Sequence, residues 1–361
     1  MSNKKRVLVI FGGQSSEHEV SRVSAESVIN NINRDKFDVE MMGITKDGRW
    51  LSYDGPVEKL GSGEWQAAAE AKTLGCGQQT SVQSIFGLQG QNGGIDVVLP
   101  ILHGCNGEDG TVQGLFELAG IPYVGCGILA SAIGMDKAYS KIIFEKEGIP
   151  QGHYRCFSRR EIFEEADYVI KQVEREFTYP CFIKPSNAGS SVGVSKAHSR
   201  DELMETLKYA SRYDRKVLVE EFINGREVEC AVLGNDSPAA STVGEVIPCN
   251  EFYDYKAKYV DNNSQVIIPA DLPDKTILEI MEYAVRAFRA LDCSGLSRVD
   301  FFVHKETGKV YINEINTLPG FTSISMYPKL WEASGVKYGE LIERLIELAL
   351  ERYEDHKREV E

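Results

Sequence analysis

The pattern of apolar and polar residues predicts alternating strands and helices in the first third of the chain. Val7–Phe11, Val39–Ile44 and Val97–Leu102 are short apolar runs of the kind that form buried parallel strands. Between the first two, apolar residues recur at helical spacing from Val20 to Ile32. Residues 55–94 are rich in Gly, Gln and Ser, which predicts loops and irregular insertions. The pattern indicates a three-layer α/β unit with mostly parallel strands.

The rest of the chain predicts two further units. At about 150 residues per domain, 361 residues correspond to two or three domains. We place the units at 1–125, 126–224 and 225–361. The predicted elements of the second unit are a helix over Asp136–Glu147, strands at Cys181–Lys184 and Val192–Ala197, a helix over Arg200–Tyr213 and a strand at Lys216–Phe222. Those of the third are a strand over Arg226–Gly234 in a mixed sheet, a polar loop at 250–266, a helix at 273–291, two strands and two C-terminal helices.

Composition and charge exclude several classes of protein. Acidic residues outnumber basic ones, 54 to 40, which argues against nucleic acid or an anionic membrane as the main partner. No apolar run approaches the roughly 18 residues of a membrane span. Eight cysteines form no Cys-x-x-Cys pair and six histidines no His-Glu-x-x-His, so neither a zinc site nor a disulfide framework is expected. A reducing cytoplasm is the expected location.

Two glycine-rich segments could bind nucleotides. Gly125–Ala130 fits the loose dinucleotide pattern G-x-G-x-x-A, but that pattern is weak without a well-defined strand, helix and acidic ribose ligand. In Phe182–Gly193 a strand delivers Lys184, and a loop of small residues follows. Backbone N–H groups of such a loop can reach phosphate oxygens, and the lysine adds a positive charge. The alternative is a flexible turn beside a surface lysine.

Val217–Glu227 has the pattern of a strand, a bend and another strand. A linker of this kind can hold an adenine by its main-chain groups while a carboxylate such as Glu227 accepts from ribose hydroxyls. Alternatively, Glu220 and Glu221 are two exposed glutamates at the edge of a strand.

The C-terminal hairpin concentrates polar groups. Alternation places Arg298, Asp300 and Phe302 on one face of its first strand, and Glu314 and Asn316 on one face of the second. A three-residue loop, 306–308, predicts Asp300 opposite Glu314 and Arg298 opposite Asn316, whereas a two- or four-residue loop would separate them. Oxygen ligands of this kind suit Mg²⁺ bound between protein and phosphates. The alternative is an Arg–carboxylate ion-pair network.

Taken together, these motifs resemble the ATP-grasp carboxylate–amine ligases and, within them, the D-alanine–D-alanine ligase family. The resemblance implies an ATP-grasp fold of the α/β class, α+β in its ATP-binding half, with an N-terminal Rossmann-like domain. It covers nearly the whole chain, and its specificity lies in seven motifs in the family's order. The matching segments are Gly12–Ser21, His103–Gly110, Met135–Lys137, Lys184–Gly193, Glu220–Glu227, Phe252–Tyr259 and Arg298–Tyr327.

The resemblance also implies a role for each matching residue. Lys137 and Lys184 would contact ATP phosphates, and Asp300, Glu314 and Asn316 would bind two Mg²⁺ or Mn²⁺ ions, with a monovalent cation as a further possibility. The other residues implied to bind ATP are Phe182, Ser191, Glu220, Phe222, Ile223, Glu227, Lys258, Phe302 and Asn313.

The implied substrate site involves both ends of the chain. Glu19 would bind the ammonium of the first D-alanine and join Ser190 and Tyr259 in a hydrogen-bonded triad, while Arg298 and the Gly320 N–H would stabilise an oxyanion. The residues alone favour a different role, because Ser16-x-x-Glu19 is a helix capping box in which Glu19 only caps its helix. The remaining residues implied to bind substrate are His103, Ser325 and Met326.

The reaction implied is ATP-dependent joining of two D-alanine molecules through an acyl phosphate, for peptidoglycan precursor synthesis. Residues 250–266, which carry Lys258 and Tyr259, are the expected lid. The family resemblance also implies a homodimer formed through the N-terminal domain. Two alternatives remain open: D-serine or D-lactate as the second substrate, and a nucleotide-binding regulator without catalysis.

Overall fold

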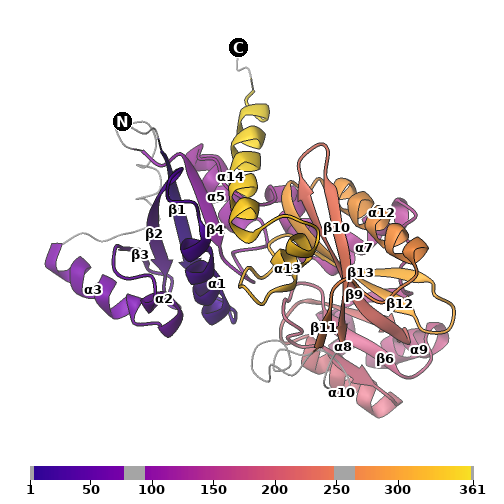
Figure 1. The fold of residues 1–361 in the computed structure, drawn as a ribbon. Helices are drawn as coiled ribbons and strands as arrows, with labels where there is room; N and C mark the ends of the chain where they lie inside the picture. Colours follow the sequence, from indigo (N-terminus) through magenta and orange to yellow (C-terminus); the bar gives the residue numbers. More distant parts are fainter. Residues whose placement is uncertain (1–3, 77–93, 248–264, 359–361) are drawn as a thin grey trace.

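The computed structural model describes residues 4–76, 94–247 and 265–358, which form three units (Figure 1). The N-terminal unit contains a four-stranded sheet of order β3-β2-β1-β4 in which only β3 is antiparallel to its neighbour. This confirms the predicted α/β unit with mostly parallel strands. Its elements are β1 (Lys5–Gly12), α1 (His18–Asn31), β2 (Phe37–Ile44), β3 (Trp50–Tyr53), α2 (Lys59–Ser62), α3 (Trp65–Cys76), β4 (Val97–Ile101) and α5 (Thr111–Ala119).

The prediction of loops throughout 55–94 is wrong for its first part, because α2 and α3 lie there. Trp65, the first residue of α3, is fully buried, and its ring meets that of Phe11 edge-on at 4.8 Å between centroids. The helix is therefore held by its packing on the sheet, a tertiary contact that its Ala-rich sequence does not reveal.

The central unit is a four-stranded antiparallel sheet of order β5-β8-β6-β7. Apolar residues of this sheet and of its three helices form a separate core, and Phe157 is the first residue of the chain in it. The elements are β5 (Tyr154–Ser158), α8 (Arg159–Glu164), α9 (Ala166–Glu176), β6 (Cys181–Pro185), β7 (Ser195–Ala197), α10 (Arg200–Ala210) and β8 (Lys216–Glu221).

The C-terminal unit contains a five-stranded sheet of order β11-β10-β9-β12-β13. Every strand pair in it is antiparallel, so the predicted mixed sheet is wrong. Two helices within the predicted 126–224 unit, one predicted and one not, pack on β13, and Phe144 lies in the core of this sheet. The elements are α6 (Ile128–Met135), α7 (Lys137–Lys146), β9 (Gly225–Gly234), β10 (Ala239–Ile247), β11 (Gln265–Ile267), α12 (Asp274–Ala290), β12 (Gly295–His304), β13 (Val310–Asn316), α13 (Met326–Ala333) and α14 (Tyr338–Asp355).

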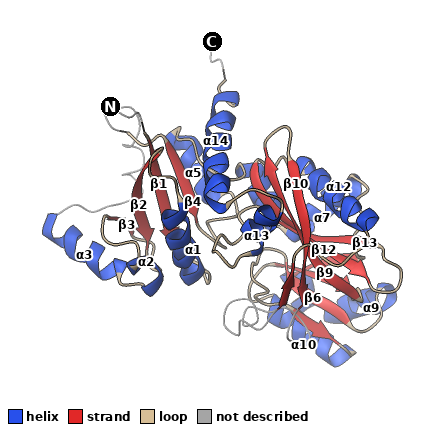
Figure 2. Ribbon diagram, viewed as in Figure 1, coloured by secondary structure: helices blue, strands red, loops and turns tan. Residues whose placement is uncertain are grey.

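The last helix, α14, packs between the N-terminal and C-terminal units. Figure 2 shows α14 between the N-terminal sheet and the antiparallel sheets, and it contacts α1, β4, β9 and β12. Its buried Arg352 donates to the carbonyl of Tyr123 at 3.0 Å and to Ser294 Oγ at 2.9 Å. The N- and C-terminal units therefore share one apolar core. In the part of the chain described, no helix is long and apolar enough to cross a bilayer.

Candidate active site

Two cavities, each of about 500 Å³, meet at the junction of the three units. The inter-sheet cavity lies between the central and C-terminal sheets and is lined by Phe182, Lys184, Glu220, Asp300 and Glu314, among others. The N-terminal cavity is lined by residues of α1, of the segment after β4 and of the segment after β13. Both are lined by Lys137, Ala188, Ser190, Glu229, Val246 and Glu314, so a molecule in one cavity lies beside a molecule in the other.

A buried glutamate holds two lysines at the inter-sheet cavity. Glu220 on β8 pairs with Lys184 at 2.7 Å and with Lys141 at 3.0 Å. Burial acts to raise the pKa of Glu220, but the charges of Lys141 and Lys184 outweigh it and lower that pKa. Lys184 also donates to Asn313 Oδ1 at 3.3 Å, and Lys137 lies 3.2 Å from Glu314. Lys184 and Lys137 therefore both contact residues of β13, one through Asn313 and the other through Glu314.

The hairpin places Asp300 opposite Glu314 and Arg298 opposite Asn316, as predicted. The predicted three-residue loop is wrong, however, because His304 and Lys309 are paired across a four-residue loop. A β-bulge at Asn313 adds one residue to β13 and restores the register. The bulge also brings Asn313 to the cavity wall beside Glu314.

Asp300 and Arg298 form a bidentate ion pair. Arg298 Nε and Nη2 donate to the two Asp300 oxygens at 2.7 and 2.8 Å, and Nε lies 2.9 Å from Glu229 Oε2. Asn316 Nδ2 also donates to Asp300, at 3.0 Å. The ion-pair alternative from the sequence is thus present in the structure, among the same oxygen groups that suit a divalent cation.

The segment after β6 is anchored to the start of α7. Ser186 Oγ donates to Asp136 and accepts from the backbone N–H of Ala138, and Lys137 Nζ donates to the carbonyl of Ala188 at 2.9 Å. Ser190 and Ser191 have φ of 49° and 59°, a left-handed conformation that is rare outside glycine. The predicted strand over Val192–Ala197 begins only at Ser195, because the residues before it form turns. The N–H of Val192 donates to the Gly189 carbonyl at 3.0 Å, and the N–H of Val194 donates to the Ser191 carbonyl at 3.3 Å.

Glu17, not Glu19, is the hydrogen-bond partner of Ser190. Glu17 is buried, and its carboxylate fills the space that a side chain at Gly104 or Gly189 would need. Glu19 instead pairs with Lys46 at 2.5 Å and its side chain is 49% exposed. The predicted Glu19–Ser190 contact is therefore wrong. The predicted capping box is wrong too, because α1 begins at His18 and no side chain caps its N-terminus by a hydrogen bond.

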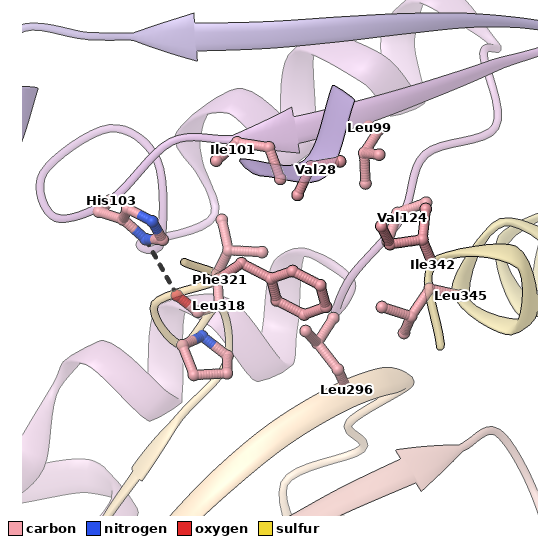
Figure 3. Close-up of a pocket in the computed structure, with 11 residues that line it drawn as sticks. Val28, Leu99, Ile101, His103, Val124, Leu296, Leu318, Phe321, Ile342 and Leu345 are labelled. Carbon is pink, nitrogen blue, oxygen red and sulfur yellow. Dashed lines mark hydrogen bonds between the residues drawn. The ribbon is translucent and has the colours of Figure 1, made fainter. Parts of the chain in front are cut away.

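His103 lies at the boundary between the N-terminal cavity and a small apolar cavity beneath it. Its Nδ1 lies 3.2 Å from the Leu318 carbonyl oxygen (Figure 3) and 3.3 Å from Glu108, and its Nε2 lies 3.2 Å from Ser24 Oγ. Burial acts to lower the pKa of His103, but Glu108 outweighs it and raises that pKa. Contacts on both ring nitrogens therefore fix the orientation of the ring.

The other predicted residues divide between the two cavities. Phe182 and Phe222 lie with ring centroids 6.1 Å apart, and Ser191, Ile223, Glu227, Phe302 and Asn313 also line the inter-sheet cavity. Gly320, Ser325 and Met326 line the N-terminal cavity, and a side chain at 320 would come within 3.1 Å of Ser325 Oγ. Lys258, Tyr259 and nearly all of the expected lid lie outside the described residues.

Comparison with known proteins decides the family. The D-ala D-ala ligase N-terminus model matches residues 6–126, and the D-ala D-ala ligase C-terminus model matches 143–347. A D-alanine–D-alanine ligase of Acetivibrio thermocellus is 65% identical over 99% of both chains. The chain belongs to the D-alanine–D-alanine ligase family.

Solved structures of family members have the same fold. VanG, a D-Ala:D-Ser ligase from Enterococcus faecalis, is 40% identical with a TM-score of 0.85, over 96% of this chain and 100% of that one. The D-alanine–D-alanine ligase from Coxiella burnetii is 34% identical with a TM-score of 0.80, over 98% of this chain and 95% of that one. These likenesses confirm the ATP-grasp architecture that the motifs imply.

Sequence reasoning missed four charged residues that line the two cavities. Glu17 lies two positions before the chosen glutamate, and Glu108 lies in the same motif as His103. Lys141 follows Lys137 by one helical turn, a spacing that places both on one face of α7. Glu229 follows Glu227 by two positions, which places both on one face of β9. Periodicity could therefore have identified the last two.

Proposed function

We propose that this member of the D-alanine–D-alanine ligase family joins two D-alanine molecules to D-alanyl-D-alanine at the junction of the two cavities, releasing ADP and phosphate. The observation that carries the proposal is the continuity of the two cavities at Lys137 and Glu314. A nucleotide in the inter-sheet cavity would direct its terminal phosphate toward a substrate in the N-terminal cavity. A carboxylate is a poor acyl donor, and its phosphorylation supplies a good leaving group.

The inter-sheet cavity suits ATP. Phe182, Phe222 and Phe302 provide apolar walls for the adenine, Glu220 and Ile223 meet the base edge, and Glu227 accepts from the ribose. Lys137 and Lys184 neutralise the phosphates, and backbone groups from Ser190 to Ser191 approach them. Lys258, outside the described residues, is proposed to complete this set.

Asp300, Glu314 and Asn316 are proposed to hold divalent cations, with Glu314 shared between two. Their oxygens are the hard donors that Mg²⁺ and Mn²⁺ prefer, and Asp300 and Glu314 are directly opposed on neighbouring strands. When bound, such ions neutralise charge on the transferring phosphoryl group. A monovalent cation is a further part of the proposal.

The N-terminal cavity is proposed to bind D-alanine. Glu17, in place of Glu19, would accept from the ammonium of the first D-alanine, and Ser190 keeps the Glu17 carboxylate in position. His103 lies beside this group, and Tyr259 would complete the triad. The amine of the second D-alanine attacks the acyl phosphate, and Arg298 and the Gly320 N–H stabilise the oxyanion that forms. Ser325 and Met326 would contact the second substrate.

The second candidate keeps the mechanism and changes the acceptor. It is favoured by the 40% identity and 0.85 TM-score to VanG, a D-Ala:D-Ser ligase. Purified protein with Mg·ATP is therefore tested for ADP and phosphate release with D-alanine, L-alanine, D-serine or D-lactate, and products are identified by mass. Asp300→Asn serves as the control for contaminating ATPase.

D-alanine alone should give the D-alanyl-D-alanine mass. Turnover that requires D-serine or D-lactate would support the second candidate, and ATP binding without any turnover would support a regulator. A cytoplasmic location and a homodimer through the N-terminal unit complete the proposal. The molar mass of the protein, measured by light scattering during size-exclusion chromatography, tests the homodimer.

A further inference from the structure

Three carboxylates lie in one row across the C-terminal sheet. Asp300 on β12 is directly opposite Glu314 on β13 and directly opposite Glu229 on β9. Like charges in opposed positions destabilise a sheet. Arg298, two residues before Asp300 on the same face of β12, supplies the compensating cation. The proposed function gives a role to every member of this group except Glu229.

Arg298 is bound by two of these carboxylates at once. Its guanidinium donates to both oxygens of Asp300, at 2.7 and 2.8 Å, and lies 2.9 Å from Glu229. Glu229 is 8% exposed and the Arg298 side chain 17%. Solvent therefore screens this cluster little, and the loss of one partner would be felt by the others.

The pairing with Asp300 conflicts with the proposed roles of both residues. A guanidinium that occupies both oxygens of Asp300 competes with a divalent cation for the same oxygens. If Arg298 released Asp300 and had no second carboxylate, a largely buried charge would be left without compensation. Glu229 provides that second carboxylate on the side of Arg298 opposite Glu314.

We propose that Glu229 is a positioning residue that holds Arg298 in the site when Asp300 binds a divalent cation. The inference rests on the proposed roles of Asp300 and Arg298. Glu229 thus leaves Asp300 open to the metal and keeps the guanidinium beside the reacting carboxyl. In the residues that the structure describes, no group of three or more His, Cys, Asp or Glu could hold a metal ion, so Glu229 is not assigned as a ligand.

Glu229→Gln tests this role because it removes the charge and keeps the shape. Mn²⁺ affinity is measured on the full chain by the spin-resonance signal of free Mn²⁺, with a saturating non-hydrolysable ATP analogue. The variant should bind Mn²⁺ about tenfold more weakly, as for other residues that orient metal ligands, and its kcat should fall. An affinity within about twofold of the wild type would overturn the proposal.

The matched control is Glu245→Gln. Glu245 is also buried on this sheet and pairs with an arginine, Arg226, at 2.6 Å. It should leave Mn²⁺ affinity unchanged, whereas an equal loss would mean that any removed charge has the same effect. If Glu229→Gln does not fold, Glu229→Asp keeps the charge at a shorter reach and should lose affinity to a smaller extent.

Arg298→Met separates positioning from direct metal binding. If Glu229 acts through Arg298, adding Glu229→Gln to Arg298→Met should change Mn²⁺ affinity by no more than about twofold. An equal further loss in both backgrounds would identify Glu229 as a ligand and overturn the proposal. Asp300→Asn tests the underlying assignment separately, because unchanged Mn²⁺ affinity in that variant would refute the metal site itself.

Discussion

At the scale of single residues, Glu17 and Glu19 differ more in surroundings than in position. Glu17 precedes the first residue of α1, is buried and bonds to Ser190 across the units. Glu19 lies in the first turn and faces Lys46. Successive residues of a helix point about 100° apart, so the residue at which α1 begins decides which glutamate reaches Ser190. A sequence motif with two glutamates does not define that start within two residues.

Glu17→Gln should therefore lower kcat/KM for D-alanine by about 10- to 100-fold, the usual size of a lost hydrogen bond to a charged group. Glu19→Gln loses only an exposed ion pair and should stay within about threefold of the wild type. ADP release as a function of D-alanine concentration measures both. A larger loss in the Glu19 variant would return the ammonium site to that residue, which also lines the N-terminal cavity.

At the scale of elements, the start of α7 holds the segment after β6 in place. Asp136 accepts from Ser186 at 2.6 Å and from Asn187 at 3.3 Å, and it pairs with Lys216 on β8. Burial acts to raise the pKa of Asp136, but Lys216 and Ser186 outweigh it and lower that pKa. A depressed carboxyl pKa stabilises the fold above the unfolded-state value, and this stabilisation is lost as pH falls through the folded-state value.

Asp136→Asn should consequently lower the thermal midpoint at pH 7, and the difference from the wild type should shrink as pH falls below about 4. Circular dichroism melts between pH 3 and pH 7 measure it. A difference that stays constant down to pH 3 would show that geometry, not the Asp136 charge, holds the segment.

The C-terminal hairpin shows what the alternation of polar residues predicts about strand register and what it does not predict. The alternation of polar residues on both strands correctly predicts that Asp300 lies opposite Glu314. The predicted three-residue loop is nevertheless wrong. The loop has four residues, and the bulge at Asn313 offsets the additional residue. Bulges respond to packing between strands and have no clear sequence signal, so an additional residue in one strand is visible only in the structure. The bulge cancels the error in loop length, so Asp300 still lies opposite Glu314.

At the scale of the whole molecule, one apolar core is shared between units, whereas the central unit has its own core. The N-terminal sheet and α14 contribute to one apolar cluster, while the central unit has a separate core. Figure 3 shows Ile342 and Leu345 of α14 near the ring of Phe321 in the small cavity beside this junction. The three tryptophans, Trp50, Trp65 and Trp331, all lie outside the central unit. Tryptophan fluorescence therefore reports on the N- and C-terminal units, and circular dichroism reports on all units.

This distribution predicts two different responses to a large-to-small substitution. Leu345→Ala should lower stability by about 2–5 kcal/mol and shift the fluorescence and dichroism transitions together, because it opens the shared core. Leu207→Ala, in the central core, should shift part of the dichroism transition to lower urea and leave the fluorescence midpoint in place. Both residues are buried leucines, so each variant is the control for the other. If Leu207→Ala moved both signals equally, the central unit would not unfold independently, and its contacts with the C-terminal sheet would have to carry the coupling.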